Sequence, residues 1–116
     1  WNCKNVLVED STIIGEYFGW NSKNVVLRRC RISSNQGFCY MGNVILEDCY
    51  LEGTDLSFEY TSGKAKVLDS IESVKNPNDL VLICPEVKEF ILDGNRNEGS
   101  LLRYSKDVKK GFDDEF

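Results

Sequence analysis

Acidic and basic side chains recur at a fixed spacing in the first half of the chain. Two columns each hold an acid, a base and an acid at one constant interval: Glu9, Arg28 and Glu47 in one, and Asp10, Arg29 and Asp48 in the other. Clustered carboxylates could support hydrolysis or bind Ca²⁺, and a carboxylate beside Arg or Lys could support elimination. Charges of alternating sign on neighbouring strands also stabilise a sheet, by about 0.2 to 1 kcal/mol per pair. Because a base between two acids opposes a Ca²⁺ site, we interpret both columns as structural.

The same interval runs through the whole of segment 1–58. One pattern appears three times, as WNCKNVLVEDSTI, WNSKNVVLRRCRI and CYMGNVILEDCYL, and it aligns Asn5 with Asn24 and Asn43. Each unit has an apolar run after its Asn, then a shorter apolar segment, then a segment with a bulky, small, bulky pattern. In the third unit we assign that last segment to Leu56-Ser57-Phe58.

Three short strands in each unit, with no room for a helix, predict an all-β parallel β-helix of about 19 residues per coil. The rival fold is a leucine-rich repeat, but its period is longer, at roughly 20 to roughly 29 residues, and its inward positions favour Leu. We expect the Asn column at a corner, with its amides bonded in a ladder. The inward positions expected in the first coil, with their equivalents later, are Val6, Val8, Ser11, Ile13, Phe18 and Trp20.

The repeat fades after Phe58, and we divide the chain there. Residues 1–58 form three coils, 59–93 irregular terminal rungs and a cap, and 94–116 a mobile polar tail. Within the cap, 65–74 is either another rung or a short helix, and 80–83 and 90–92 are strands. Residues 101–110 could form a short helix. Because the chain begins inside a repeat unit, we expect further coils before Trp1, and an open edge there could support a homo-oligomer.

Composition excludes several classes of partner. A net charge of -5 and no basic stripe argue against nucleic acid and against an anionic membrane surface. No apolar run reaches the roughly 18 residues of a membrane-spanning helix, and no segment resembles a signal peptide. With no His and no CxxC among five cysteines, neither a metal site nor a cofactor is expected. The cysteines are interpreted as small core residues, whose reduced thiols favour the cytoplasm.

Four motifs in order carry a family resemblance: GEYFGWNSKN, FCYMGNVILEDC, DLSFEYTS and SVKNP, within residues 1–93. Together they resemble DUF3737, a bacterial family of uncharacterised proteins. The resemblance implies a right-handed parallel β-helix related in shape to pectate lyases. It also implies no secretion signal and no established activity.

The family motifs GEY and FEY bring a second set of candidate residues into view. Aromatic rings beside carboxylates could form a sugar platform or an acid–base pair, and we take Glu16, Tyr17, Asp55, Glu59 and Tyr60 as candidate carbohydrate-site residues. Two functions stay open: a non-catalytic scaffold that binds carbohydrate or protein, and a polysaccharide lyase or glycoside hydrolase. An enzyme should show a groove with two carboxylates, or a carboxylate and a Lys or Arg, within about 6 Å.

Overall fold

The computed structural model describes residues 4–15, 21–33, 38–52, 57–75, 77–91, 102–109 and 111–112. Those residues form strands and turns, and none of them is helical, so no described helix is long and apolar enough to cross a membrane. The strands are β1 (Lys4–Glu9), β2 (Thr12–Ile14), β3 (Lys23–Arg28), β4 (Arg31–Ser33), β5 (Gly42–Leu51), β6 (Gly63–Val67), β7 (Val74–Lys75), β8 (Leu80–Ile83), β9 (Phe90–Ile91) and β10 (Leu102–Ser105).

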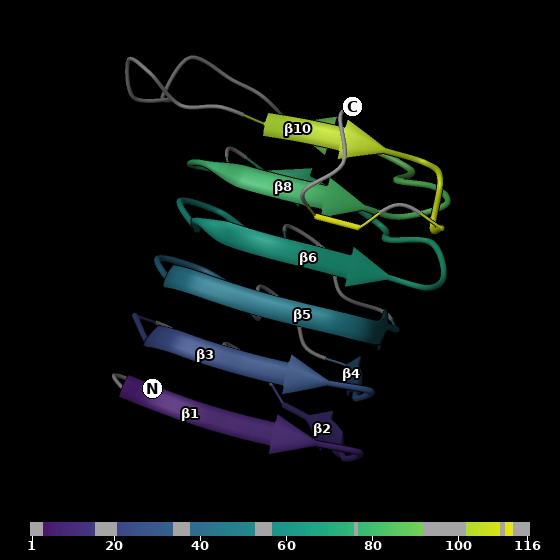
Figure 1. The fold of residues 1–116 in the computed structure, drawn as a ribbon. Helices are drawn as coiled ribbons and strands as arrows, with labels where there is room; N and C mark the ends of the chain where they lie inside the picture. The colour runs from purple at the N-terminus through teal and green to yellow at the C-terminus, as the bar shows by residue number, and fades with distance from the viewer. Residues whose placement is uncertain are drawn as a thin grey trace.

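One long parallel sheet runs the height of the molecule, with its strands in the order β1-β3-β5-β6-β8-β10 (Figure 1). Val6 lies beside Val25, Val25 beside Val44, and Val44 beside Gly63, so the first three steps of the sheet all have the period of the sequence repeat. The next step, from Gly63 to Leu80, is shorter than this period, and the step from Leu80 to Leu102 is longer. The all-β parallel β-helix expected from the repeat is therefore confirmed.

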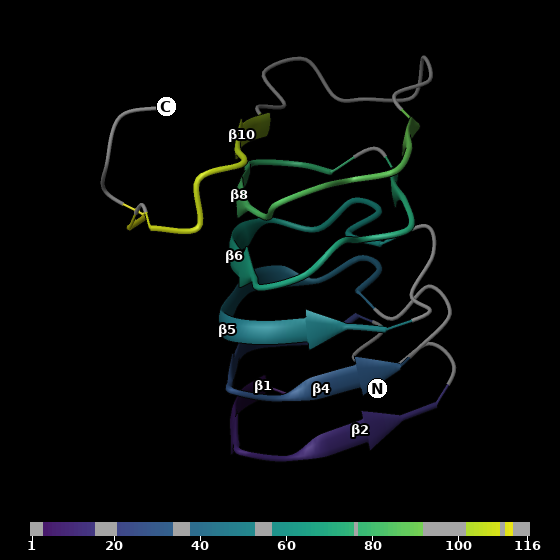
Figure 2. The same ribbon diagram turned by 90° about the vertical axis from the view of Figure 1, so that its right-hand side faces the viewer.

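The other faces of the coil are built from shorter strands. β2 pairs with β4, and β4 pairs with the second half of β5, which is continuous around a register shift between Leu46 and Cys49 (Figure 2). Higher in the stack, β7 pairs with β9, and bridges join Ser57 to Val74 and Ile71 to Val87. All these pairings are parallel, as stacking of successive coils requires.

Inward side chains of successive strands form the core. Leu27, Leu46, Ala65 and Leu82 stack as one fully buried column, since each is the register partner of the next. Their residue types follow the alternation of a half-buried strand. Cys30 and Cys49, the equivalents of Ser11, are also buried, which confirms that column as small core residues.

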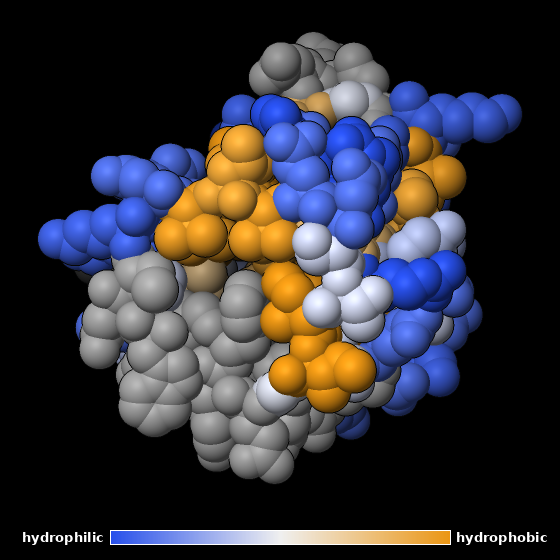
Figure 3. Space-filling view, turned by 90° about the horizontal axis from the view of Figure 1, so that it is seen from below, coloured by the Kyte–Doolittle hydropathy of each residue, from blue (hydrophilic) through white to orange (hydrophobic). Residues whose placement is uncertain are grey.

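The first coil is less covered. Val6, Val8 and Ile13 point to the core but are only partly buried, because no described strand pairs with the outer edges of β1 and β2. Seen from that end, apolar side chains lie between polar ones (Figure 3). Phe18 and Trp20 lie outside the described residues.

Sharp corners separate the faces, and two columns of residues with positive φ make them. Asn5, Asn24 and Asn43 have φ of 59°, 56° and 57°. A second column at Asp10, Arg29 and Asp48 has φ of 52°, 52° and 53°. Asn and Asp tolerate this left-handed conformation better than most residues do. The amides form the expected ladder, because Asn24 Nδ2 donates to Asn5 Oδ1 at 3.1 Å and Asn43 Nδ2 donates to Asn24 Oδ1 at 2.9 Å.

The assignment of the third segment was wrong in its register. Phe38 stacks on Phe58 with 5.4 Å between ring centroids, and Tyr40 lies against Tyr60 at 5.2 Å. The partner of 38–40 is therefore 58–60, not 56–58. Neither described segment is a strand, and Tyr40, expected to point inward, is 44% exposed, because a φ of 56° turns the chain there.

The upper part of the stack is more regular than the sequence suggested. Residues 63–67 form β6, so 65–67 belong to a further rung, and no residue of 65–74 is helical, so the helical alternative is wrong. The strand expected at 80–83 is present as β8, and the strand expected at 90–92 is present over 90–91 as β9, with Leu92 outside the described residues. The helix considered for 101–110 is also wrong over 102–105, where β10 pairs with β8. Leu102 and Tyr104 pack on the core while Arg103 is exposed, which is the alternation of a strand. The division into coils, cap and tail stays a prediction.

Candidate functional site

The candidate carbohydrate-site residues are only partly placed. Glu16, Tyr17 and Asp55 lie outside the described residues. Glu59 and Tyr60 are described, and they lie on the corner that leads into β6. Whether the full set of five converges therefore stays a prediction.

Glu59 forms an ion pair with a residue of the next coil. Its Oε2 lies 3.0 Å from Lys75 Nζ, and its side chain is 13% exposed while that of Lys75 is 30% exposed. Oε2 is buried and has no partner in hydrogen-bond geometry among the described residues, so the contact is electrostatic rather than a directed hydrogen bond. The separation is within the distance of about 6 Å expected of a carboxylate and a lysine in an enzyme site. However, the two groups contact each other rather than facing a space for a substrate.

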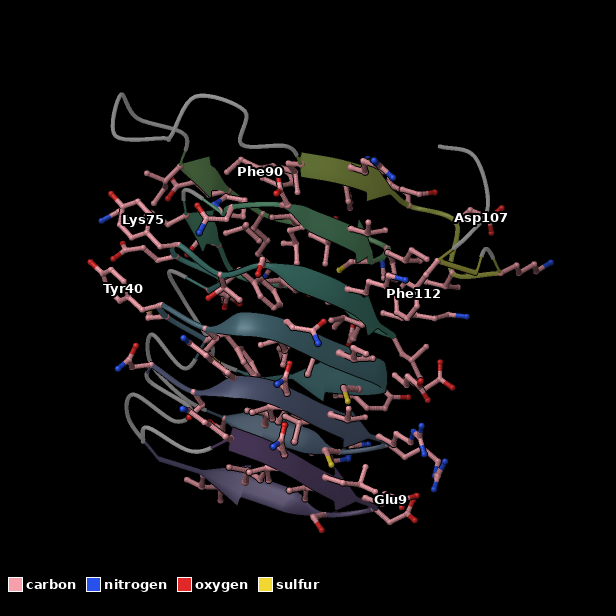
Figure 4. All side chains as sticks on the ribbon, turned by 60° about the vertical axis from the view of Figure 1, so that its left-hand side comes forward. Glu9, Tyr40, Lys75, Phe90, Asp107 and Phe112 are labelled. Atoms are coloured by element: carbon pink, nitrogen blue, oxygen red, sulfur yellow. The ribbon has the colours of Figure 1, made fainter. Side chains whose placement is uncertain are left out.

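Tyr40 lies near this ion pair with its ring against that of Tyr60, and it projects from the same side of the stack as Lys75 (Figure 4). Burial raises the pKa of Tyr40, and the Glu59 carboxylate raises it further. Burial also raises the pKa of Cys39 to about 12, so its thiol is not a nucleophile near neutral pH. The corner thus offers one half-exposed aromatic ring beside a neutralised carboxylate.

The two acid–base columns are ion-paired, as the structural interpretation predicted. Arg29 reaches back to the preceding coil, with Nε 2.6 Å from Asp10 Oδ1 and an Nη2 atom 3.2 Å from Glu9 Oε2. Hydrogen bonding from Arg29 lowers the pKa of Asp10. Arg28 instead pairs with the following coil, where its Nε lies 3.0 Å from Glu47 Oε2.

Asp48, the third residue of the second column, does not pair with Arg29, the base of that column. Its closest described basic group is Lys66 of the next coil, at 4.0 Å, rather than Arg29. Within the described part of the chain, no three acidic, Cys or His side chains cluster closely enough to hold a metal ion. The columns therefore neutralise charge between coils and offer no arrangement for metal-assisted chemistry in the region described.

A groove of about 280 Å³ lies on the outer face of the long sheet, where β6 and β8 begin. Its charged lining residues are Lys64, Asp79 and Arg103, and its other lining residues are Asn43, Ser62, Gly63, Leu80 and Val81. Its volume is close to the lower end of the roughly 300 to 1,000 Å³ typical of ligand pockets. The groove can therefore take one small molecule or one unit of a longer chain.

Lys64, Val81 and Arg103 are register partners on three successive strands. Since strands are about 4.8 Å apart, the two basic residues start about 10 Å apart, on either side of an apolar side chain. Neither Lys64 nor Arg103 forms an ion pair with any residue that the structure describes. This contrasts with Arg28, Arg29 and Lys66, which are all paired.

The floor of the groove depends on close strand contact at Gly63. A Cβ atom at this position would lie 2.0 Å from the Val44 carbonyl oxygen, and the φ of 145° is one that residues with a side chain rarely adopt. Asn43 lies beside this contact, and its backbone N–H donates to Ser62 Oγ at 3.2 Å. β5 and β6 are thus held at a fixed separation where the groove opens.

Sequence reasoning missed this groove. The regular period ends at Gly63, and the shorter and longer steps that follow cannot be read from a periodic pattern. The available signal was the alternation of Leu102, Arg103 and Tyr104, which indicates a strand with its basic residue on the outer face.

Comparison with known proteins adds a family and no activity. No curated protein and no solved structure matches the chain significantly. The family described as "Protein of unknown function (DUF3737)" matches residues 1–103, which include every strand of the stack up to the middle of β10. The chain therefore belongs to the DUF3737 family.

Proposed function

We propose that this chain is a non-catalytic β-helix scaffold that binds a ligand on the outer face of its long sheet. The observation that carries the proposal is the contrast between two parts of that face. At the C-terminal ends of β1 and β3, and at the aligned residues of β5, the acids and bases neutralise one another, whereas Lys64 and Arg103 line a groove without a described ionic partner. Uncommitted charge in a hollow of ligand size is a property of binding sites.

A cytoplasmic location belongs to the same proposal. Among the described residues, Cys30, Cys39, Cys49 and Cys84 are buried and form no disulfide. Reduced core thiols are typical of a reducing compartment. Fractionation of the producing cells tests this, and recovery of the protein outside the cytoplasmic fraction would contradict it.

The second candidate function is a carbohydrate-active enzyme, either a polysaccharide lyase or a glycoside hydrolase. One observation favours it: the Glu59 carboxylate and the Lys75 ammonium lie 3.0 Å apart, next to Tyr40 and Tyr60. A carboxylate and a base beside an aromatic ring could act on a sugar. Against this, the two groups contact each other, and Glu59 Oε2 is buried.

One experiment separates the two functions. The chain is incubated with polygalacturonate, alginate, xylan and cello-oligosaccharides, and binding is measured by affinity electrophoresis or calorimetry. Turnover is measured in the same samples as new reducing ends and as absorbance of unsaturated products.

The scaffold predicts binding without turnover, and the Lys64→Gln variant should bind more weakly. Turnover that disappears in Glu59→Gln but persists in Glu52→Gln would reject the scaffold and support the enzyme. Glu52 is a suitable control because it is an exposed acid, ion-paired to Arg31, that lies outside both the corner and the groove.

A further inference from the structure

The groove at the start of β6 and β8 has a chemistry that selects its ligand. We infer that it binds a polyhydroxylated small molecule that carries one carboxylate or phosphate, such as a sugar acid or a sugar phosphate. This inference rests on the proposed scaffold function and specifies its ligand.

The basic side chains supply the first part of the argument. Lys64 and Arg103 are both exposed, flank Val81, and have no described ionic partner. Arg presents a planar set of donors that fits a carboxylate or phosphate, and Lys adds a point charge. Two positive charges on one groove, in a chain of net charge -5, make it a local site for an anion.

The acceptors of the groove supply the second part. The amide ladder has a direction: each Nδ2 donates to the Oδ1 of the preceding coil. Asn43 ends the ladder on the groove side, so its Oδ1 receives no hydrogen bond from the residues described. Asp79 adds a carboxylate to the same lining, and Ser62 adds a hydroxyl.

A bare anion does not fit this combination of groups. It would meet Lys64 and Arg103, but Asp79 would repel it, and a carboxylate alone would make no hydrogen bond to the oxygen of Asn43. A ligand with hydroxyl groups can donate to the Asn43 oxygen while its charged group meets the bases. The apolar surface of Val81 between the charges can receive the C–H face of such a molecule. The groove therefore fits a small molecule that carries both hydroxyl groups and an anionic group.

The test uses three probes that differ only at one carbon: galactose, galacturonate and galactose 6-phosphate. Acetate and inorganic phosphate are the bare anions. Dissociation constants are measured by calorimetry for the wild type, for Lys64→Gln and Arg103→Gln, and for Lys109→Gln, which removes an exposed charge that does not line the groove. Thermal unfolding of each variant checks that it is folded.

We expect galacturonate or galactose 6-phosphate to bind at least tenfold more tightly than galactose and than either bare anion. The tighter of the two identifies the charged group as carboxylate or phosphate. Each groove variant should weaken this binding about tenfold or more, since a hydrogen bond to a charged group is lost. Lys109→Gln should leave it unchanged.

Two results would overturn the inference. Binding of galactose as tight as that of its charged analogues would mean that the charges do not select the ligand, while the scaffold function would stand. Absence of binding by every hydroxylated anion would refute the assigned ligand class. Turnover of a polysaccharide would instead reject the scaffold function itself, so the two failures are distinguishable.

Discussion

Gly63 gives the sharpest test of how the coils stack. Replacing it with Ala puts a Cβ atom 2.0 Å from the Val44 carbonyl oxygen and 2.6 Å from the Val44 nitrogen, where no side chain can yield because both are backbone. The φ of 145° adds backbone strain of about 1 to 3 kcal/mol. β6 must therefore move away from β5, which weakens a strand pair at the centre of the long sheet.

We expect Gly63→Ala to lower the free energy of unfolding by about 3 kcal/mol or more, from strain and from the displaced strand pair. At about 4 °C per kcal/mol for a domain of this size, Tm should fall by at least about 10 °C. Urea denaturation followed by circular dichroism measures the first quantity, and calorimetry measures the second.

Gly42→Ala is the matched control. Its Cβ would lie no closer than 3.6 Å to another atom, the Cγ of Lys23, and its φ is not in the left-handed region. The substitution also restricts the unfolded chain, so it should change stability by no more than about 1 kcal/mol, in either direction. Equal urea midpoints for Gly63→Ala and Gly42→Ala would refute the contact between β5 and β6.

Three further predictions concern the corner ladder, the charge column and the buried thiols. Asn24→Ala should be less stable than Asn24→Gly by about 1 kcal/mol in urea denaturation, because only Gly adopts the φ of 56° without strain; the reverse order would contradict the corner. Because Arg29 lowers the pKa of Asp10 below its ordinary 3.8, the stability that this carboxylate contributes is present above that pH and lost as the pH falls through the folded pKa. The difference between wild type and Asp10→Asn should therefore shrink on going from pH 7 to pH 3, and a constant difference would count against the pairing. Cys39, whose pKa is raised to about 12, should resist iodoacetamide at pH 8 until the chain is unfolded, as mass spectrometry of the alkylated peptides can show; rapid labelling of the folded chain would contradict its burial.

The fold could be predicted because the repeat encodes register directly. Asn5, Asn24 and Asn43 share one conformation and one set of hydrogen bonds, so identical residues at a constant spacing fix how the first three coils align. The error at the third segment has a physical cause. Leu56-Ser57-Phe58 fits a bulky, small, bulky pattern, but stacking of Phe58 on Phe38 places Glu59 in the middle position.

The candidate site was harder to predict because it depends on residues outside the repeat. Glu59 is neutralised by Lys75, whose position in the next coil follows no period in the sequence. The groove joins Lys64 to Arg103 across strands whose steps are irregular. Where the spacing between strands is irregular, the sequence does not show which residue will lie beside a given charged residue. The register of such a strand is set instead by how its apolar neighbours pack in the core.

The most direct test of the account is a titration of the ¹⁵N-labelled chain with galacturonate, observed by amide chemical shifts. Binding in the groove predicts saturable shifts centred on Ser62 to Lys64, Asp79 to Val81 and Arg103, and the Arg103→Gln variant should need about tenfold more galacturonate for the same shifts. Shifts centred instead on Tyr40, Glu59 and Tyr60 would move the site to the neighbouring corner and contradict the assignment of the groove. Absence of any saturable shift with galacturonate and with galactose 6-phosphate would contradict it as well.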